Sequence, residues 1–172
     1  LDGARIWNAA TSLNVLESEI AHFFDSVSVC FSKGLGAPVG SALVGNYDFI
    51  MEARRYRKQF GGGMRQAGII AAGALFALEN NRERIQDDHI NAKLLADGLS
   101  EINGIEINPE DIESNILIFS LTDMSSYEFT QRLEDYNIHV LPWDDISVRA
   151  VTNSMVSSEN IEETLKKIRI IT

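Results

Sequence analysis

The sequence is poor in the features that mark secreted, membrane-embedded and nucleic-acid-binding proteins. Its 172 residues include a single cysteine, Cys30, so no internal disulfide can form and a reducing, cytoplasmic setting is expected. No apolar run approaches the roughly 20 residues that span a bilayer, and the first residues carry no signal-peptide pattern. Because the formal net charge is −10, neither a nucleic acid nor a membrane is expected as a partner.

Metal-ligating residues are also scarce. The three histidines, His22, His89 and His139, lie far apart and show none of the spacings that zinc sites use. Cys30 falls on one face of an alternating segment, where a core position is a better interpretation than a nucleophile. We therefore expect no metal site.

The chain does carry the hydrophobic patterning of a globular α/β protein, with 45% hydrophobic and 23% charged residues. The segment 64–81 is apolar nearly all round, which predicts a buried helix. Helical spacing and period-two alternation predict helices over 13–24, 47–59, 64–81, 83–103, 125–136 and 157–171, the last capped by Ser158, and strands over 26–32, 40–45, 115–121, 139–143 and 146–152.

Composition changes after Gly104, and this change suggests two domains. Residues 105–172 are expected to form a small α+β domain. Residues 1–104 have α/β character but too few strands for a complete sheet, so they are expected to be part of a larger domain. The chain starts at Leu1, in what reads as the end of a strand, and we expect an upstream half to be missing.

Asp2 and Lys33 occupy equivalent places one βαβ unit apart. Each follows a predicted strand, and a helix separates the two strands. In open α/β sheets, ligands bind at the carboxyl ends of the strands. A lysine amine can form a Schiff base with pyridoxal phosphate, and a carboxylate can pair with the protonated pyridine nitrogen. From spacing alone, a surface lysine and an exposed aspartate remain the simpler alternative.

Three stretches resemble a known family. The segments LDGAR, SVSVCFSKGLGAPVGSALVG and GGGMRQAGIIAAGALFALE are similar to the threonine aldolases, which are fold-type-I pyridoxal-phosphate enzymes. The similarity continues through NPEDIESNILIF and ISVRAVT, so it covers essentially the whole chain but only the second half of the family's sequence. It implies the C-terminal half of such an enzyme, namely part of the large α/β domain plus a small α+β domain.

The resemblance also implies roles for individual residues. Lys33 resembles the Schiff-base lysine and Asp2 the partner of the pyridine nitrogen. Arg5 resembles the residue near the cofactor hydroxyl and the substrate carboxylate. Arg149 resembles the arginine that binds the substrate α-carboxylate, a role that suits the bidentate guanidinium; a salt bridge at the rim is the alternative.

The cofactor phosphate has two candidate ligands, and the family suggests that a neighbouring subunit contributes here. Arg65 follows three glycines near a helix start, where a bound anion would relieve its conflict with the helix dipole, and Ser32 is a weaker candidate. The other basic residues nearby, Arg54, Arg55, Arg57 and Lys58, are better interpreted as a solvated helix face.

One position departs from the family pattern. The family often has histidine where this chain has Asn153, and an amide cannot titrate near neutral pH. Any positioning or acid–base role of that histidine is therefore in doubt here, and the sequence does not identify the catalytic base.

The resemblance implies pyridoxal phosphate as cofactor and retro-aldol cleavage of L-threonine or L-allo-threonine to glycine and an aldehyde. It also implies an amino acid substrate, the missing N-terminal half as a partner, and a homotetramer. Two alternatives stay open: another fold-type-I lyase that catalyses β-elimination, and a non-catalytic fragment of such an enzyme.

Overall fold

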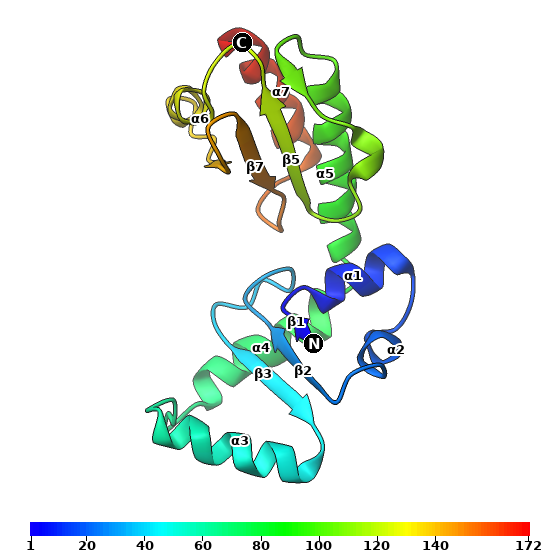
Figure 1. Ribbon diagram of the computed structural model, residues 1–172, viewed down its shortest axis with the longest axis vertical. Coiled ribbons are helices and arrows are strands. Elements are labelled where there is room, and N and C mark those ends of the chain that lie inside the picture. The colour runs from blue at the N-terminus through cyan, green and yellow to red at the C-terminus, as the bar shows by residue number, and fades with distance from the viewer. The chain divides into compact units, whose positions relative to one another are not determined.

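The computed structural model describes all residues from Leu1 to Thr172. It divides into two compact units, Leu1–Ile85 (unit 1) and Gln86–Thr172 (unit 2) (Figure 1). The domain boundary expected at Gly104 refers to the domains of a whole enzyme and stays a prediction. None of the helices combines the length and the apolar character that crossing a membrane requires.

Unit 1 is built on a three-stranded mixed sheet with the order β1 (Asp2–Gly3), β2 (Ser26–Cys30) and β3 (Ser41–Gly45). Strand β1 runs parallel to β2, and β3 runs antiparallel to it. Its helices are α1 (Ile6–Leu13), α2 (Glu17–Ala21), α3 (Tyr47–Gln59) and α4 (Gly68–Asn80).

The single helix predicted over residues 13–24 is wrong, because the helix is interrupted after Leu13. Helix α1 ends at Leu13, and Asn14 takes a left-handed conformation with φ 53°. Helix α2 starts after Leu16, whose backbone N–H donates to Glu19 Oε2 at 2.8 Å. An asparagine tolerates the left-handed region better than most residues, so the helical spacing on either side belongs to two helices.

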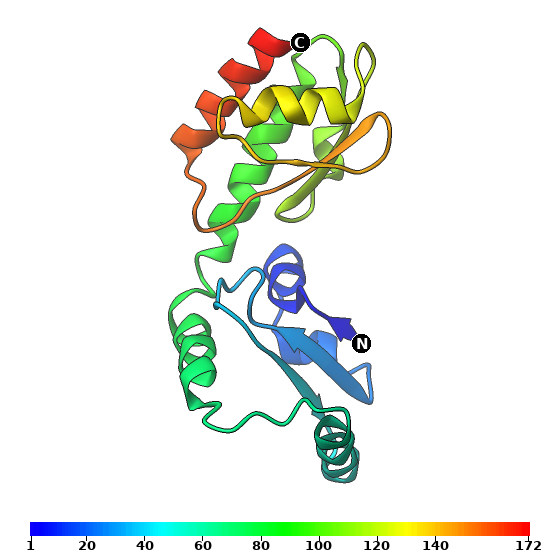
Figure 2. The same ribbon diagram turned by 90° about the vertical axis from the view of Figure 1, so that its left-hand side faces the viewer.

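The burial predicted for the helix over 64–81 is also not met within this chain. Helix α4 buries Ala74 and Ala77, but Ile69, Leu75 and Phe76 are 81%, 56% and 63% exposed. Figure 2 shows α4, in green, with much of its length along no other helix of unit 1. The all-round apolar sequence is therefore real, but unit 1 covers only one side of the helix.

Unit 2 is a four-stranded antiparallel sheet with three helices on one face (Figures 1 and 2). The strand order is β4-β5-β7-β6. Its elements are α5 (Ile85–Ser100, which begins at the last residue of unit 1), β4 (Ile105–Glu106), the 3-10 turn η1 (Pro109–Asp111), β5 (Ile116–Leu121), α6 (Ser126–Glu134), β6 (Leu141–Pro142), β7 (Ser147–Val151) and α7 (Ser158–Ile171).

Alternation along β5 and β7 decides what faces the core of unit 2. Phe119 pairs with Val148, and Leu117 with Ala150, and all four are buried against the helices. Phe119 meets Phe129 of α6 edge to face, with ring centroids 5.7 Å apart. The residues between them therefore point to the other face of the sheet.

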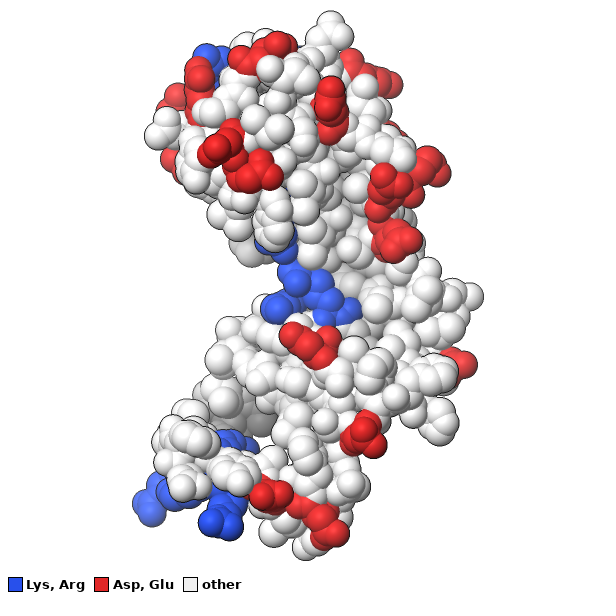
Figure 3. Space-filling model, in the orientation of Figure 1, with Lys and Arg blue, Asp and Glu red and all other residues white.

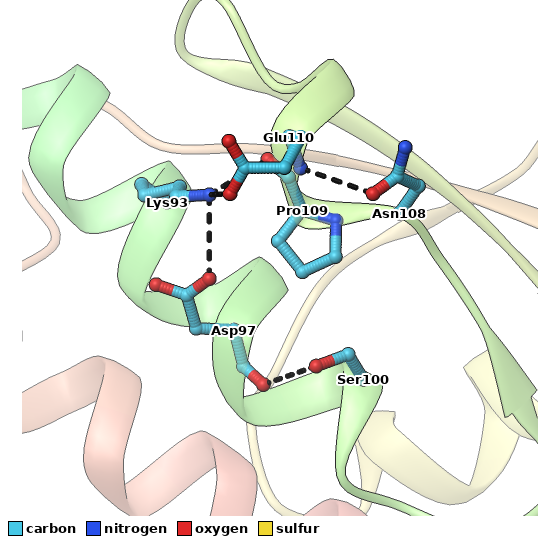
Figure 4. Close-up of polar contacts among 6 residues, drawn as sticks. All are labelled: Lys93, Asp97, Ser100, Asn108, Pro109 and Glu110. Atoms are coloured by element: carbon cyan, nitrogen blue, oxygen red, sulfur yellow. Dashed lines mark hydrogen bonds and ion pairs between the residues drawn. The ribbon is translucent and has the colours of Figure 1, made fainter.

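Polar contacts join α5 to the turn η1 and cap the start of α7. Lys93 Nζ of α5 lies 2.9 Å from Glu110 Oε1 and 3.4 Å from Asp97 Oδ1 (Figure 4). The hydrogen bond that Lys93 donates to the Glu110 carboxylate raises the pKa of the Lys93 amine. Helix α7 is capped by Ser157, whose hydroxyl accepts from the N–H of Asn160 at 3.3 Å; the cap predicted at Ser158 is therefore one residue too late.

Candidate active site

The carboxyl ends of β1 and β2 lie side by side in unit 1. The two strands are parallel, and Asp2 pairs in register with Ser28, so the two strands are direct neighbours in the sheet. Lys33 follows the end of β2 at Cys30 by three residues. Both Asp2 and Lys33 are exposed. One carboxylate oxygen of Asp2 accepts from the N–H of Ala4 at 3.1 Å, which orients the side chain and leaves its other oxygen available.

The segment Phe31–Gly40, here called the lysine turn, carries Lys33 from β2 to β3. Its ends are closed by the Phe31 N–H, which donates to Gly40 O at 3.0 Å, and by the Ala37 N–H, which donates to Phe31 O at 2.9 Å. Within it, the N–H of Gly36 donates to Lys33 O at 2.8 Å. Gly36 has φ 72°, a conformation that glycine adopts without strain. The lysine turn is thus a hydrogen-bonded structure.

Apolar packing anchors the lysine turn to the core of unit 1. Leu35 has no exposed surface and packs in the cluster that includes Trp7 and Val27. The rings of Trp7 and Phe31 lie 5.7 Å apart. A side chain at Gly34 would collide with the amide of buried Asn8. The glycine next to Lys33 is therefore required by close packing.

The other predicted residues of unit 1 do not all gather at this turn. Ser32, in the turn, is exposed, and its hydroxyl lies 3.2 Å from Cys30 Sγ. Arg5 is half-buried and immediately precedes α1. Arg65 is exposed and lies three residues before α4 begins at Gly68, and no hydrogen bond joins it to the lysine turn. The structure thus brings Asp2, Ser32 and Lys33 to the end of the sheet where β1 and β2 have their carboxyl ends.

The basic residues of α3 form a solvated face. Helix α3 has no buried residue, and it carries Arg54, Arg55, Arg57 and Lys58. Figure 3 shows basic side chains gathered where α3 ends. Arg57 and Lys58 pack beside Gly62 and Gly63, so the glycines that follow α3 let the chain turn closely over these two side chains.

Arg149 belongs to unit 2, on the face of the sheet away from the core. It lies in β7, paired with Ile118 of β5 and Leu141 of β6. Val148 and Ala150 on either side of it point into the core. Alternation along β7 therefore places Arg149 on the opposite face from these two residues. Arg149 is half-buried, between two apolar neighbours that are 43% and 59% exposed.

A buried hydrogen-bond network holds the end of β7, shortly after Arg149. The hydroxyl of Thr152, which is 2% exposed, donates to Asp88 O of α5 at 2.5 Å. The N–H of Thr152 donates to Asn115 O at 3.0 Å. The side-chain Nδ2 of Asn115 donates in return to Thr152 O at 2.8 Å. The next residue, Asn153, is exposed and caps the following turn by accepting from the N–H of Met155 at 3.0 Å.

Sequence reasoning missed the supporting residues. Asn8, Leu35, Asn115 and Thr152 are buried, and none was singled out. Their only signal was position, since Leu35, Asn115 and Thr152 lie inside the segments that carry the resemblance and Asn8 lies three residues after one. Such residues support the site through tertiary contacts, and a local sequence motif does not show which residues make those contacts.

The chemistry of the donor set suits pyridoxal phosphate. An exposed amine at the end of one strand and a carboxylate at the end of its parallel neighbour are what the aldehyde and the pyridine nitrogen of this cofactor require. No group of histidine, cysteine, aspartate and glutamate side chains is arranged to hold a metal ion.

Comparisons with known proteins place this arrangement in a family. Residues 1–122 match the family model described as beta-eliminating lyase. The chain is 41% identical to the low specificity L-threonine aldolase of Escherichia coli K12 over 163 residues, which are 95% of this chain and 47% of that protein. It thus spans about half the length of the curated relatives that it matches.

Solved structures show the same fold. A Listeria monocytogenes protein, provisionally assigned as an L-allo-threonine aldolase, is 24% identical with a TM-score of 0.83, over 100% of this chain and 51% of that one. A serine palmitoyltransferase of Sphingomonas wittichii is 21% identical with a TM-score of 0.70, over 90% of this chain and 41% of that one. The predicted fold, the C-terminal half of a fold-type-I enzyme, is confirmed.

Proposed function

The chain belongs to the beta-eliminating lyase family, and we propose that it is the lysine-bearing half of a pyridoxal-phosphate-dependent threonine aldolase. Its reaction is the cleavage of L-threonine, L-allo-threonine and related β-hydroxy-α-amino acids to glycine and an aldehyde. In this proposal, residues 1–104 belong to the large domain and 105–172 form the small domain. The observation that carries it is the parallel pairing of β1 with β2, which brings Asp2 to the strand that leads into Lys33.

Each predicted residue has a task in this reaction. Lys33 attaches the cofactor covalently through its amine. Asp2 would hold a proton at the pyridine nitrogen through its exposed carboxylate. Ser32 and Arg65 are the candidate ligands of the phosphate. When bound, the cofactor supplies an electron sink for the pair that remains at Cα after the Cα–Cβ bond breaks.

The substrate is oriented by its carboxylate. Arg149, with help from Arg5, binds it in a bidentate manner, which fixes the direction of the Cα–Cβ bond. A base takes the proton of the β-hydroxyl, the carbon–carbon bond breaks, and Cβ leaves as the aldehyde carbon. Cα then gains a proton to give glycine. This chain offers no side chain that the geometry singles out as the base, and Asn153 cannot serve as one.

The proposal includes an upstream half, either on the same polypeptide or as a separate one. This half would cover apolar surface of unit 1 such as the exposed side of α4, and we call its complex with this chain the assembled enzyme. A homotetramer in the cytoplasm completes the proposal, in line with the single cysteine and the sharing of sites between subunits that the resemblance implies.

The experiment is borohydride reduction of the assembled enzyme after addition of pyridoxal phosphate, read by peptide mass. We expect a phosphopyridoxyl group on Lys33 and its loss in Lys33→Ala. Lys58→Ala is the matched control, because it removes an exposed lysine of the same unit and should keep the label. A label elsewhere, or none in the unchanged protein, contradicts the proposal.

A second function has one observation in its favour, which is the name of the matching family model, beta-eliminating lyase. β-Elimination would use the same lysine and aspartate. The products separate the two reactions: an aldolase releases glycine and an aldehyde, whereas elimination from serine or threonine releases ammonia and a keto acid. A protein that takes up the cofactor and gives neither would be the non-catalytic fragment.

A further inference from the structure

The residue that caps the C-terminal end of α4, Asn81, is hydrogen-bonded to the lysine turn. Asn81 Nδ2 donates to Leu35 O at 2.7 Å, over a separation of 46 residues. Asn81 directly follows the last residue of α4, and its own N–H donates to Ala77 O at 2.9 Å. The bond from the Asn81 backbone holds this residue at the end of α4. The bond from its side chain holds the Leu35 carbonyl of the lysine turn. This contact ties the turn to an element distant in sequence.

The bond matters because it adds a constraint from outside the turn to the bonds within it, directly beside two glycines. Gly34 and Gly36 lie on either side of Leu35, and glycine has the most freedom to lose on folding. The Leu35 side chain is fully buried, so a change in the direction of its carbonyl would also disturb the core. Asn81 satisfies that carbonyl and thereby fixes the direction of the chain two residues after Lys33.

We propose that Asn81 is a positioning residue for Lys33, which acts through the Leu35 carbonyl without touching the cofactor. The proposal rests on the assignment of Lys33 as the residue that attaches pyridoxal phosphate. A lysine side chain has four rotatable carbons, so the Cα position and the direction of the turn set which points its amine can reach. Covalent attachment needs the amine close to the aldehyde carbon and correctly oriented.

The neighbouring residue provides a matched control. Asn80 is also an asparagine, and its Nδ2 donates to Phe76 O at 2.8 Å, within its own helix and exposed to solvent. Replacing either asparagine by aspartate adds the same charge at nearly the same place and removes the same amide donor. Only Asn81→Asp removes a bond to the lysine turn.

The test compares Asn81→Asp with Asn80→Asp in the assembled enzyme, using three measurements. Amide hydrogen exchange without cofactor reports on the turn, the rate of cofactor attachment reports on the amine, and a pH titration of the visible spectrum reports on the surroundings of the attached cofactor. For Asn81→Asp we expect exchange in residues 31–40 to be about tenfold faster. We also expect attachment to be roughly 10- to 100-fold slower, with a shifted titration midpoint. Asn80→Asp should match the unchanged protein in all three.

Two outcomes overturn the inference while the proposed function stands. If exchange in residues 31–40 is unchanged in Asn81→Asp, then Asn81 does not hold the turn. If exchange is faster but attachment and spectrum equal those of Asn80→Asp, the role is structural alone. Failure of the unchanged protein to take up pyridoxal phosphate would overturn the proposed function and the inference with it, and the unchanged protein shows this by itself. If Asn81→Asp does not fold, Asn81→Ala is compared with Asn80→Ala by the same measurements.

Discussion

The two units are nearly equal in length but differ in how well each buries its own apolar residues. Unit 2 has a core cluster of 17 buried hydrophobic residues, whereas the main cluster of unit 1 has seven. Unit 1 instead exposes large apolar side chains, such as Phe23 at 82%, Phe60 at 83% and Ile69 at 81%. Unit 1 thus leaves more of its large apolar side chains in contact with solvent than unit 2 does.

Charge divides in the same way. Unit 1 has nine lysines and arginines against eight aspartates and glutamates, and unit 2 has six against 17. Unit 1 is therefore close to neutral, and the net charge of −10 comes from unit 2, whose acidic side chains are spread over the visible surface in Figure 3. Unit 2 has the surface of a domain that meets water on most sides, while unit 1 has the surface of a part that packs against something else.

The sharpest way to break this comparison is to separate the units. Expressed alone, residues 86–172 should fold and unfold cooperatively, because their sheet and three helices enclose a common core. Residues 1–85 alone should aggregate or stay loosely packed, because too little of their apolar surface is buried to offset the loss of chain entropy. Thermal unfolding followed by circular dichroism checks both fragments.

The fragment of residues 1–85 has its own control, which is the upstream half. If the uncovered surface is the cause, adding that half should restore a cooperative transition. A fragment of residues 1–85 that already unfolds cooperatively by itself would show that unit 1 does not depend on a partner.

Two phenylalanines sharpen the comparison at the level of single residues. Phe129→Ala in unit 2 removes a fully buried ring that packs on Phe119, and it should reduce the free energy of unfolding by about 3–5 kcal/mol. Phe76→Ala in unit 1 removes a ring that is 63% exposed, and it should cost less than about 0.5 kcal/mol in this chain. Denaturant titration measures both values.

The same substitution in the assembled enzyme makes the test stricter. If the upstream half or another subunit covers α4, Phe76→Ala should there cost clearly more than in this chain. An equal, small cost in both would mean that Phe76 faces water in either state.

The same difference explains what the sequence could predict. Helix α3 has the bounds that periodicity and its basic end predict, Tyr47–Gln59, and β5, α6 and β7 lie within a residue or two of their predicted limits. In these segments, local pattern and packing agree. The helix over 13–24 was wrong because one left-handed residue, Asn14, interrupts a spacing that continues across it.

The burial of α4 shows a different limit. Its apolar sequence predicts burial on all sides, whereas unit 1 covers only one side of the helix. At the candidate site, recognition selected Asp2 and Lys33, and the parallel register then placed their strands together. It could not select Asn81 or Thr152, because their roles depend on carbonyls of residues that are distant in sequence.

The two units should also differ in catalysis, with cofactor attachment at Lys33 in unit 1 and the main contact to the substrate carboxylate, Arg149, in unit 2. Arg149→Lys replaces a bidentate guanidinium by a point charge. We expect KM for threonine to rise roughly 10- to 100-fold in the assembled enzyme, equivalent to about 1.4–2.8 kcal/mol, while cofactor attachment at Lys33 stays normal. Steady-state kinetics together with the borohydride label measure both effects. Loss of the label in Arg149→Lys, or an unchanged KM, would contradict this division of tasks.

The smallest expected effect concerns the acid sensitivity of unit 2. His89 of α5 is 9% exposed, and burial lowers the pKa of its imidazole below 6.5 because the charged form is poorly solvated there. The unfolded chain therefore binds a proton at higher pH than the folded one does. The stability that His89 contributes in its neutral form is present above that range and is lost as the pH falls through 6.5 and below.

Replacing His89 by glutamine removes this titration and should flatten the pH dependence of unfolding of residues 86–172 between roughly pH 7 and 5. His139→Gln is the matched control, since it removes an exposed histidine of the same unit. Urea titrations over this range compare the two variants. The control should keep the slope of the unchanged fragment. If His89→Gln kept that slope as well, groups other than His89 would carry the acid sensitivity, and the burial of His89 on α5 would not contribute to it.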